Sequence, residues 1–269
     1  MEHKAIALIA QSRLSPQALQ AIEAILAPGV NLEKIANCPD DLAFAMVRTC
    51  AGLFTIPPQG DTKSWHSIRI PVDADVDAAS IMTYCPQGSC VVAQIPKDVA
   101  VLQDPAAALD DRRAALMFLV HFVGDEHQPM HGATDVPDDH GGGLKFMNNI
   151  SYAGKPLSLH RVWDYAMADP AKVDWSLPDD VLTAQASALA LALGAGLPSG
   201  ATSDFAVEAA LESHDIARTV IYPAYRASHG DDSLADYRAK MQPIAYRRIQ
   251  LASVRLAALL ELALVGGKP

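Results

Sequence analysis

Apolar residues recur along this chain mostly at the three- and four-residue spacing of amphipathic helices. The second helical stretch follows Ser15-Pro16, a pair typical of a helix start. The last stretch contains AYRRIQLASVRLAALLELAL, the clearest amphipathic pattern in the sequence. We predict helices over residues 5–14, 16–27, 91–103, 106–126, 179–195, 203–222 and 231–264.

Other segments lack the helical spacing. LKFMNNISYAG, residues 144–154, places Asn148-Asn149 between apolar and aromatic residues, which predicts a small β-hairpin. Residues 51–76 and 132–143 have the proline and glycine content of loops. The patterns therefore predict a mainly α protein with one hairpin and long loops.

Composition adds limits on size and location. The chain has 269 residues, 50% of them hydrophobic, and no linker, charge block or repeat divides it, so we predict one domain over residues 1–269. No apolar run approaches the ~18 residues of a membrane span. The opening MEHKAIALIA lacks the pattern of a signal peptide. The net charge of −10 argues against a broad basic surface for nucleic acid, although bound metal ions would supply positive charge locally.

The four cysteines leave the redox compartment open. Cys85 and Cys90 lie in YCPQGSC, where the spacing fits either two free thiols or a small disulfide across a turn. Cys38 and Cys50 offer a second pairing, and neither pair has the doubled CxxC spacing of a thiolate zinc site. Disulfides would place the protein outside the cytosol, in conflict with the missing signal peptide.

The stretch LVHFVGDEHQPMHG, residues 119–132, puts ionisable side chains into an otherwise apolar helix. His121 and Asp125 are four residues apart and therefore share a helical face. Pro129 ends the helix, which lets His131 fold back toward the same point. A lone histidine on an apolar helix is most commonly a satisfied core residue, and only a repeat of the arrangement favours a metal site.

The arrangement recurs in LHRVWD, where His160 and Asp164 are again four residues apart. Imidazole and carboxylate together suit zinc, and five such ligands exceed the four of a structural zinc site. We therefore predict a multinuclear zinc centre, which is typical of phosphoester hydrolysis. No nucleophile elbow or phosphate-binding loop competes with it. Further candidate ligands, each of which alone also fits a surface or capping role, are His3, Asp40, Asp41 and His66.

Several motifs together resemble one known family. HFVGDEHQPMH, the glycine run after it, LHRVWD, and WH ahead of IRIP resemble the zinc-dependent single-strand-specific nucleases of the S1/P1 type, which share a fold with zinc phospholipase C. The similarity extends from about His3 to Leu260. It implies a single-domain helical fold with one small hairpin and long loops around the zinc site. It also implies hydrolysis of single-stranded DNA and RNA to 5′-phosphorylated products by metal-activated attack of water on phosphorus, with removal of 3′-phosphates in many members.

The ligands of the family carry over by position. The resemblance makes Asp40, His66 and Asp125 the catalytic residues, with Asp41 a neighbour. It implies up to three zinc ions, held by His3 and Asp125, by Asp40, His66, His121 and Asp125, and by His131, His160 and Asp164. CPQGSCVVAQI resembles the disulfide-bearing segment of the family, which implies a Cys85–Cys90 bridge and a secreted or periplasmic location. We expect His127 to orient a carboxylate or the substrate, and Glu126 to be solvated.

The sequence departs from the family pattern at its start and in the base pocket. Met1-Glu2-His3 stands where a mature Trp helps to hold the third zinc. Either a signal peptide and a Trp precede Met1 in the native chain, which is what we expect, or the third site is incomplete. Ser67 replaces an aromatic residue that stacks on a base, and Arg69 replaces an acid. Tyr152 is retained, and we predict that Tyr152 and Arg69 contact the substrate. Two asparagines are replaced by Gly143 and Ser158.

These observations favour a zinc-dependent endonuclease acting on single-stranded DNA or RNA, with 3′-nucleotidase activity and no obligate protein partner. The altered base pocket favours a second hypothesis, a phosphomonoesterase or phospholipase-C-like hydrolase of the same fold. An incomplete zinc cluster would fit a third, a catalytically impaired nucleotide-binding protein.

Overall fold

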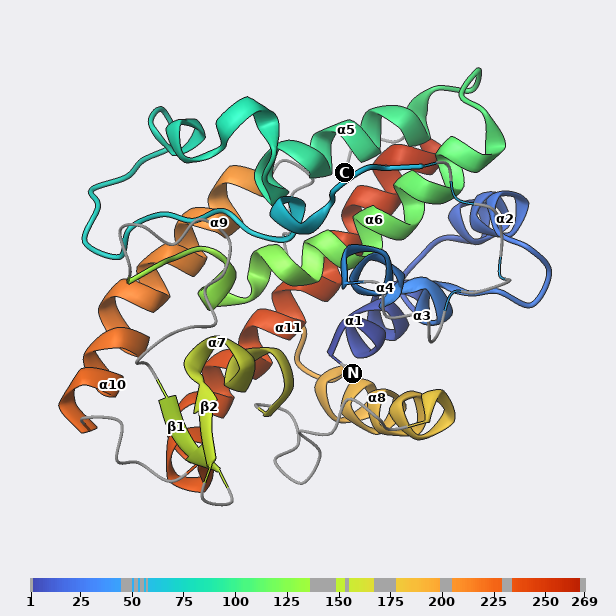
Figure 1. Ribbon diagram of the computed structural model, residues 1–269. Helices are drawn as coiled ribbons and strands as arrows, with labels where there is room; N and C mark the ends of the chain where they lie inside the picture. The colour runs from blue at the N-terminus through green and yellow to red at the C-terminus, as the bar shows by residue number, and fades with distance from the viewer. Residues whose placement is uncertain are drawn as a thin grey trace.

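The computed structural model describes residues 2–44, 50, 53, 56, 58–135, 149–152, 155–166, 178–198, 205–228 and 234–266. Helices dominate this part of the chain, and its two strands form one sheet (Figure 1). The helices are α1 (Glu2–Gln11), α2 (Pro16–Ile25), α3 (Leu32–Ile35), α4 (Cys38–Phe44), α5 (Val91–Gln103), α6 (Leu109–His127), α7 (Leu159–Arg161), α8 (Asp179–Leu193), α9 (Ala206–Ile216), α10 (Tyr222–Ser228) and α11 (Leu234–Val265). The strands are β1 (Asn149–Tyr152) and β2 (Lys155–Ser158), and the short helical turns are η1 (Lys63–His66), η2 (Ile81–Tyr84), η3 (Pro86–Gly88), η4 (Pro129–His131), η5 (Val162–Ala166) and η7 (Ala217–Ile221).

Helix α6 lies at the centre of the molecule. Every residue from Ala114 to His127 is buried, and α6 packs against α1, α5, α9 and α11 (Figure 1). A helix enclosed in this way needs apolar side chains on all sides, and ALMFLV supplies them before the polar residues begin. His121 and Asp125 therefore lie inside the protein, where their polar groups need partners.

The predicted mainly α class is confirmed, and most predicted helices lie within a few residues of their expected bounds. Helix α6 begins at Leu109 rather than at residue 106, because the amides of Ala106 and Ala107 donate to the side chain and carbonyl of Asp104 in a turn. Helix α9 continues through η7 and α10 to Ser228, beyond the predicted end at residue 222. Helices α3 and α4 were not predicted, since four and seven residues are too short to show a period.

The predicted β-hairpin is present, but it lies further along the chain than expected. Its strands cover residues 149–152 and 155–158, whereas the prediction was residues 144–154. Asn149 pairs with Ser158 and Tyr152 pairs with Lys155 in an antiparallel register. Asn149 therefore belongs to a strand, because it opens β1.

The two segments predicted as loops meet beside the carboxyl end of α6. The amide of Ile68 donates to the carbonyl of His131 at 2.9 Å, and the amide of Thr134 donates to the carbonyl of Ile70 at 2.8 Å. An isolated parallel bridge joins Pro71 to Thr134. The segment around His66 is thus held against the residues that follow α6. The Gly141–Gly143 run lies outside the described residues.

Two disulfides cross-link the amino-terminal half. Cys85 and Cys90 are bridged, as the family resemblance implied, and Cys38 is bridged to Cys50, so no cysteine is free. The first bridge closes the loop before α5, and the second joins the start of α4, which carries Asp40, to the chain beyond it. Within the described residues, no helix is both long and apolar enough to cross a bilayer.

Candidate metal centre

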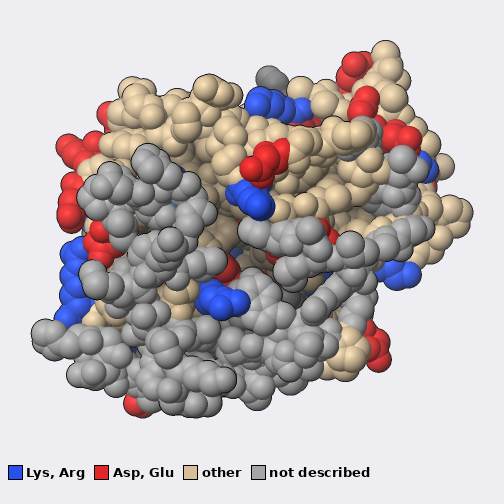
Figure 2. All heavy atoms as spheres, viewed as in Figure 1, with Lys and Arg blue, Asp and Glu red and all other residues tan. Residues whose placement is uncertain are grey.

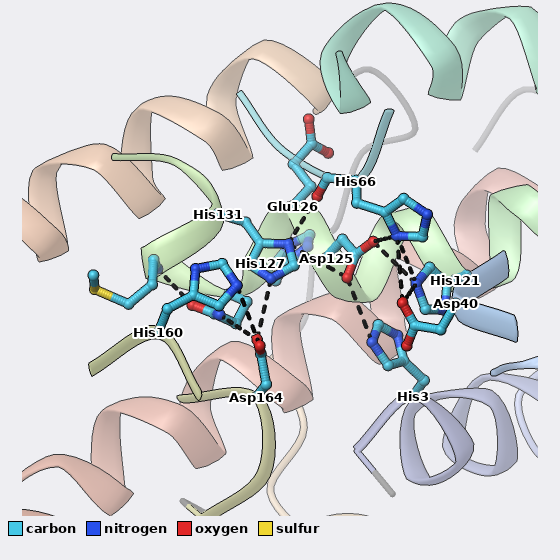
Figure 3. A network of polar contacts seen from close by, with 12 residues as sticks. His3, Asp40, His66, His121, Asp125, Glu126, His127, His131, His160 and Asp164 are labelled. Atoms are coloured by element: carbon cyan, nitrogen blue, oxygen red, sulfur yellow. Dashed lines mark hydrogen bonds and ion pairs between the residues drawn. The ribbon is translucent and has the colours of Figure 1, made fainter. Parts of the chain in front are cut away.

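Four predicted ligands converge on one point at the side of α6. His121 and Asp125 come from one face of α6, His66 from η1 and Asp40 from the first turn of α4 (Figure 3). The Oδ2 atom of Asp125 lies 2.9 Å from His66 Nδ1 and 3.1 Å from His121 Nε2. The Oδ1 atom of Asp40 lies 3.6 and 3.4 Å from the same two nitrogens, which are 3.1 Å apart. We call these four residues the first group.

The chemistry of the first group suits a bound cation. The Nδ1 atom of His121 donates to the carbonyl of Ala36 at 2.7 Å, which directs its Nε2 atom toward two carboxylate oxygens. Burial lowers the pKa of His121, but the carboxylates of Asp125 and Asp40 outweigh it and raise that pKa well above its ordinary value. Ligands of a tetrahedral zinc at about 2.0–2.1 Å lie about 3.3 Å apart, which is close to the spacings of this group.

A second group lies on the other side of Asp125. It consists of His131 at the end of η4, His160 in α7 and Asp164 in η5 (Figure 3). The two oxygens of Asp164 lie 3.1 Å from His131 Nε2 and 3.2 Å from His160 Nε2. The Nδ1 atom of His131 donates to the carbonyl of His66 at 2.7 Å, so its Nε2 atom is directed into the group.

A third group forms where α1 meets α6. It consists of His3, His121 and Asp125. The Nε2 atom of His3 lies 3.5 Å from Oδ1 of Asp125, and the His3 ring stacks on the His121 ring at 4.0 Å between centroids. Burial and the neighbouring His121 lower the pKa of His3 to about 3, so its imidazole is neutral and able to act as a ligand.

Asp125 connects the three groups. Its Oδ2 atom faces the first group, while its Oδ1 atom faces His3 and lies 3.4 Å from His131 Nδ1. Burial would raise the pKa of Asp125, but His121 and His131 hold it well below its ordinary value, so the side chain is a carboxylate. Burial likewise opposes the charge of His131, yet Asp125 and Asp164 raise the pKa of His131 to about 9.

The expectation for Glu126 was wrong, and so was the carboxylate role expected for His127, whose substrate role stays a prediction. Glu126 is buried rather than solvated, and both its carboxylate oxygens are without a hydrogen-bond partner among the described residues. Its side chain points away from the three groups (Figure 3), and burial raises its pKa well above the ordinary value. His127 does not orient a carboxylate ligand, because its ring contacts the carbonyl of Val123 at 2.7 Å and the guanidinium of Arg255 at 2.9 Å.

The structure describes only some of the residues that we assigned to the base pocket. Ser67 and Arg69 alternate with the buried Ile68 and Ile70, so the two departures from the family pattern lie on one side of this segment. Tyr152 belongs to β1, but its side chain lies outside the described residues.

Some supporting residues were missed by sequence reasoning. Gln128 donates to Asp164 Oδ1 at 2.7 Å, and its place inside the HQPMH motif was a signal that could have found it. Ser158, noted only as a departure, accepts from the amide of Arg161 and caps the turn that carries His160. The carbonyl of Ala36 had no sequence signal, since any residue supplies a carbonyl.

Comparison with known proteins gives this geometry a family. A family model described as S1/P1 Nuclease matches residues 2–265. The chain belongs to the S1/P1 nuclease family. Nuclease S1 of Aspergillus oryzae is 25% identical over 276 residues, which cover 97% of this chain and 89% of that protein. Nuclease P1 of Penicillium citrinum is 28% identical over 171 residues, 61% of this chain and 56% of that protein. Endonuclease 5 of Arabidopsis thaliana is 34% identical over 156 residues, 55% of this chain and 50% of that protein.

Family membership settles the class of activity. The S1/P1 nuclease described here is a hydrolase that acts on nucleic acid. All eight predicted ligands fall into the three groups that could hold a metal ion, which agrees with a metal-dependent nuclease.

Proposed function

We propose that this protein is a zinc-dependent phosphodiesterase that cleaves single-stranded DNA and RNA to 5′-phosphorylated products and also removes 3′-phosphates from nucleotides. The observation that carries the proposal is the convergence of eight His and Asp side chains in three adjacent groups that Asp125 connects. Nitrogen and carboxylate oxygen are the ligands that zinc accepts together.

Up to three zinc ions would be held by the three groups. His3 and Asp125 would hold one ion, and the other two would be held by Asp40, His66, His121 and Asp125, and by His131, His160 and Asp164. Bound zinc supplies Lewis acidity, which activates a water for in-line attack on phosphorus and neutralises the phosphate oxygens. Asp40, His66 and Asp125 are the catalytic residues of the proposal, and Asp125 fixes the spacing between the groups through its two oxygens.

Arg69 and Tyr152 are our proposed substrate contacts. A guanidinium group pairs with two phosphate oxygens at once, so Arg69 would hold a phosphate of the strand. Tyr152 would stack on a base, which is the usual way in which proteins grip single strands without reading a sequence. A base can be splayed onto such a side chain only when it is not stacked within a duplex. These roles favour single-stranded substrates.

A phosphomonoester or a phospholipid substrate is the second candidate. Arginine at position 69, where the family has an acid, and serine at position 67, where it has an aromatic residue, shift the pocket from base stacking toward phosphate binding. Both changes favour a phosphomonoesterase or a phospholipase-C-like hydrolase. The two disulfides support a periplasmic or secreted location, where such bonds persist.

One experiment separates the candidates. The zinc-loaded protein is offered single-stranded DNA, RNA, 3′-AMP and a phosphatidylcholine analogue, with the chelator-stripped protein as control, and its zinc content is measured by elemental analysis. We expect the zinc-loaded protein to cleave both polymers and 3′-AMP. The chelator-stripped protein should be inactive and should regain activity when zinc is returned. Turnover of the monoester or lipid alone would favour the second candidate. Fewer than two zinc ions per chain would overturn the mechanism.

A further inference from the structure

Gly124 lies between two residues of the third group on the same face of α6. His121, Gly124 and Asp125 are spaced by three and four residues, so all three point toward α1. The imidazole of His3 covers this face. It stacks on His121 with an angle of 14° between the rings and directs Nε2 toward Asp125.

The absence of a side chain at Gly124 makes room for this imidazole. A Cβ atom at position 124 would lie 2.5 Å from Nδ1 and 2.9 Å from Cε1 of His3, and 3.3 Å from the Cδ1 atom of Ile6. Carbon atoms in ordinary contact are about 3.5–4.0 Å apart. A methyl group at this position therefore cannot coexist with the His3 ring in its present place.

The backbone does not explain the glycine. Gly124 lies inside the regular helix α6 and has no positive φ. In a helix interior, glycine is less favourable than alanine. The close approach of His3 is the structural reason for a glycine here.

A buried ion pair limits how His3 could move away. Lys4, the next residue of α1, is fully buried and donates to Glu33 at 2.6 Å and to Thr183 at 3.1 Å. Thr183 also donates to Glu33 at 2.7 Å, so the first turn of α1 is tied to both α3 and α8. The backbone of His3 is therefore anchored, so a methyl group at position 124 would displace the side chain of His3, which is 21% exposed, rather than the helix that carries it.

We propose that Gly124 is a positioning residue for the His3 position of the metal centre, in that the space left by its missing side chain aligns the His3 imidazole with Asp125. The inference rests on the proposed zinc centre. Gly124→Ala would leave the ligands of the first and second groups in place and displace only His3. The helix would tolerate the alanine, so the variant folds with one metal position fewer.

The first test is zinc stoichiometry of the full chain by elemental analysis. Gly124→Ala and His3→Ala should each lose about one equivalent of zinc relative to the wild type. The control is Gly194→Ala at the C-cap of α8, where φ is −66° and a Cβ atom would meet only the backbone oxygens of Ala190 and Leu191, at 3.0 and 3.9 Å. That variant should keep the full complement. Gly124→Ala with the wild-type zinc content and affinity would overturn the inference, whereas a metal-poor wild type would overturn the proposed function instead.

The second test needs no metal. Thermal midpoints of the chelator-stripped wild type, both single variants and the double variant form a double-mutant cycle. Once His3 is replaced by alanine, the methyl group at position 124 meets only the Cδ1 atom of Ile6, the end of a side chain that can shift by a few tenths of an ångström, and Gly124→Ala should raise the midpoint through helix propensity. In the presence of His3 the same substitution should raise it less or lower it. Equal changes in the two backgrounds would overturn the inference.

Discussion

Asp125 is the residue on which the metal centre depends, because each of its oxygens faces a different set of partners. In Asp125→Asn the shape is kept, but an NH2 group replaces one oxygen and presents hydrogens to histidine nitrogens. We expect kcat on single-stranded DNA to fall at least about a hundredfold, since replacing even a group behind a ligand typically costs 10–100-fold.

Zinc content and kcat are measured together on this variant. The matched control is Asp215→Asn in α9. The Asp215 side chain is 59% exposed, and Arg218 is its one salt-bridge partner in the described part of the chain. It should retain wild-type zinc and kcat. An Asp125→Asn protein with unchanged zinc and rate would show that Asp125 is not a ligand.

Gln128 supports the second group from outside, since its amide donates to Asp164. Gln128→Ala removes this donor without removing any ligand. We expect the zinc affinity of the second group to weaken about 10–100-fold while the zinc content at saturation is unchanged. Competition with a chelator of known affinity measures the change, and Gln103→Ala at the exposed end of α5 is the control. An unaltered affinity would mean that Asp164 needs no support.

The sequence was informative about residues wherever a ligand had a spacing partner. His121 and Asp125, and again His160 and Asp164, are four apart on helical segments, and both pairs share a group in the structure. His3, Asp40 and His66 have no such partner, and only the family resemblance favoured a ligand role for each of them over a surface or capping role. The role of Gly124 was out of reach, because it depends on the distance between α1 and α6, which no local pattern contains.

Among the elements, α11 and α9 hold the carboxyl end of α6. Arg248 of α11 donates to the carbonyl of His127 at 3.0 Å, and Ser213 of α9 donates to the carbonyl of Glu126 at 2.6 Å. These donors satisfy carbonyls that the end of a helix leaves unpaired. Glu212 of α9 accepts from both Arg248 and Arg255, which joins the two helices. The turn between Asp125 and His131 is anchored in this way.

This network predicts a defined dependence of stability on pH. Burial would raise the pKa of Glu212, but hydrogen bonds from Arg255 and Arg248 lower it to about 2. A carboxyl whose pKa falls on folding stabilises the native state fully above its unfolded value, about 4.3, and this stabilisation is lost as the pH falls toward 2. Because the side chain is 32% exposed, we expect a contribution of about 1–2 kcal/mol.

Denaturant unfolding between pH 7 and pH 2.5 tests this expectation. Glu212→Gln should be less stable than the wild type at pH 7, and the difference should shrink as the pH falls below about 4. Glu208→Gln, one turn earlier on α9, is the control. The Glu208 side chain is 59% exposed and reaches Arg255 only at 3.4 Å, so this variant should differ little at any pH. A Glu212→Gln difference that does not change with pH would contradict the assigned pKa.

Helices were predicted correctly where the hydrophobic periodicity or the helix-start residues were clear. Predictions failed where tertiary contacts determine which residues form the element. Helices α5 and α8 begin at their predicted residues, because the backbone is not helical at Cys90 and Pro178, the residues just before them. The hairpin strands begin at Asn149 rather than at residue 144, because the pairing register decides where they lie and no local pattern contains it. The contact between residues 66–72 and 131–134 joins two segments without periodicity, so nothing local announces it.

At the scale of the whole molecule, the protein and its nucleic-acid substrate are both negatively charged and should repel each other. The chain carries −10, and on the face shown in Figure 2 the described Lys and Arg residues are scattered rather than gathered into one patch. Up to three zinc ions would add as much as +6 in one place, beside the ligands themselves. Attraction for the polyanionic strand would then come from the metal centre and a few side chains rather than from a basic surface.

A shallow salt dependence follows from this distribution of charge. Each phosphate neutralised by Lys or Arg on a single strand contributes about −0.7 to the slope of log affinity against log salt. With Arg69 as the main such contact, we expect a slope of kcat/KM between about 0 and −1.5 from 50 to 200 mM salt. Arg69→Ala should flatten the slope by about 0.7, while Arg13→Ala, between α1 and α2, should leave it unchanged. A slope steeper than about −3 would require several Lys or Arg contacts and would place the strand on a basic surface rather than in the metal centre.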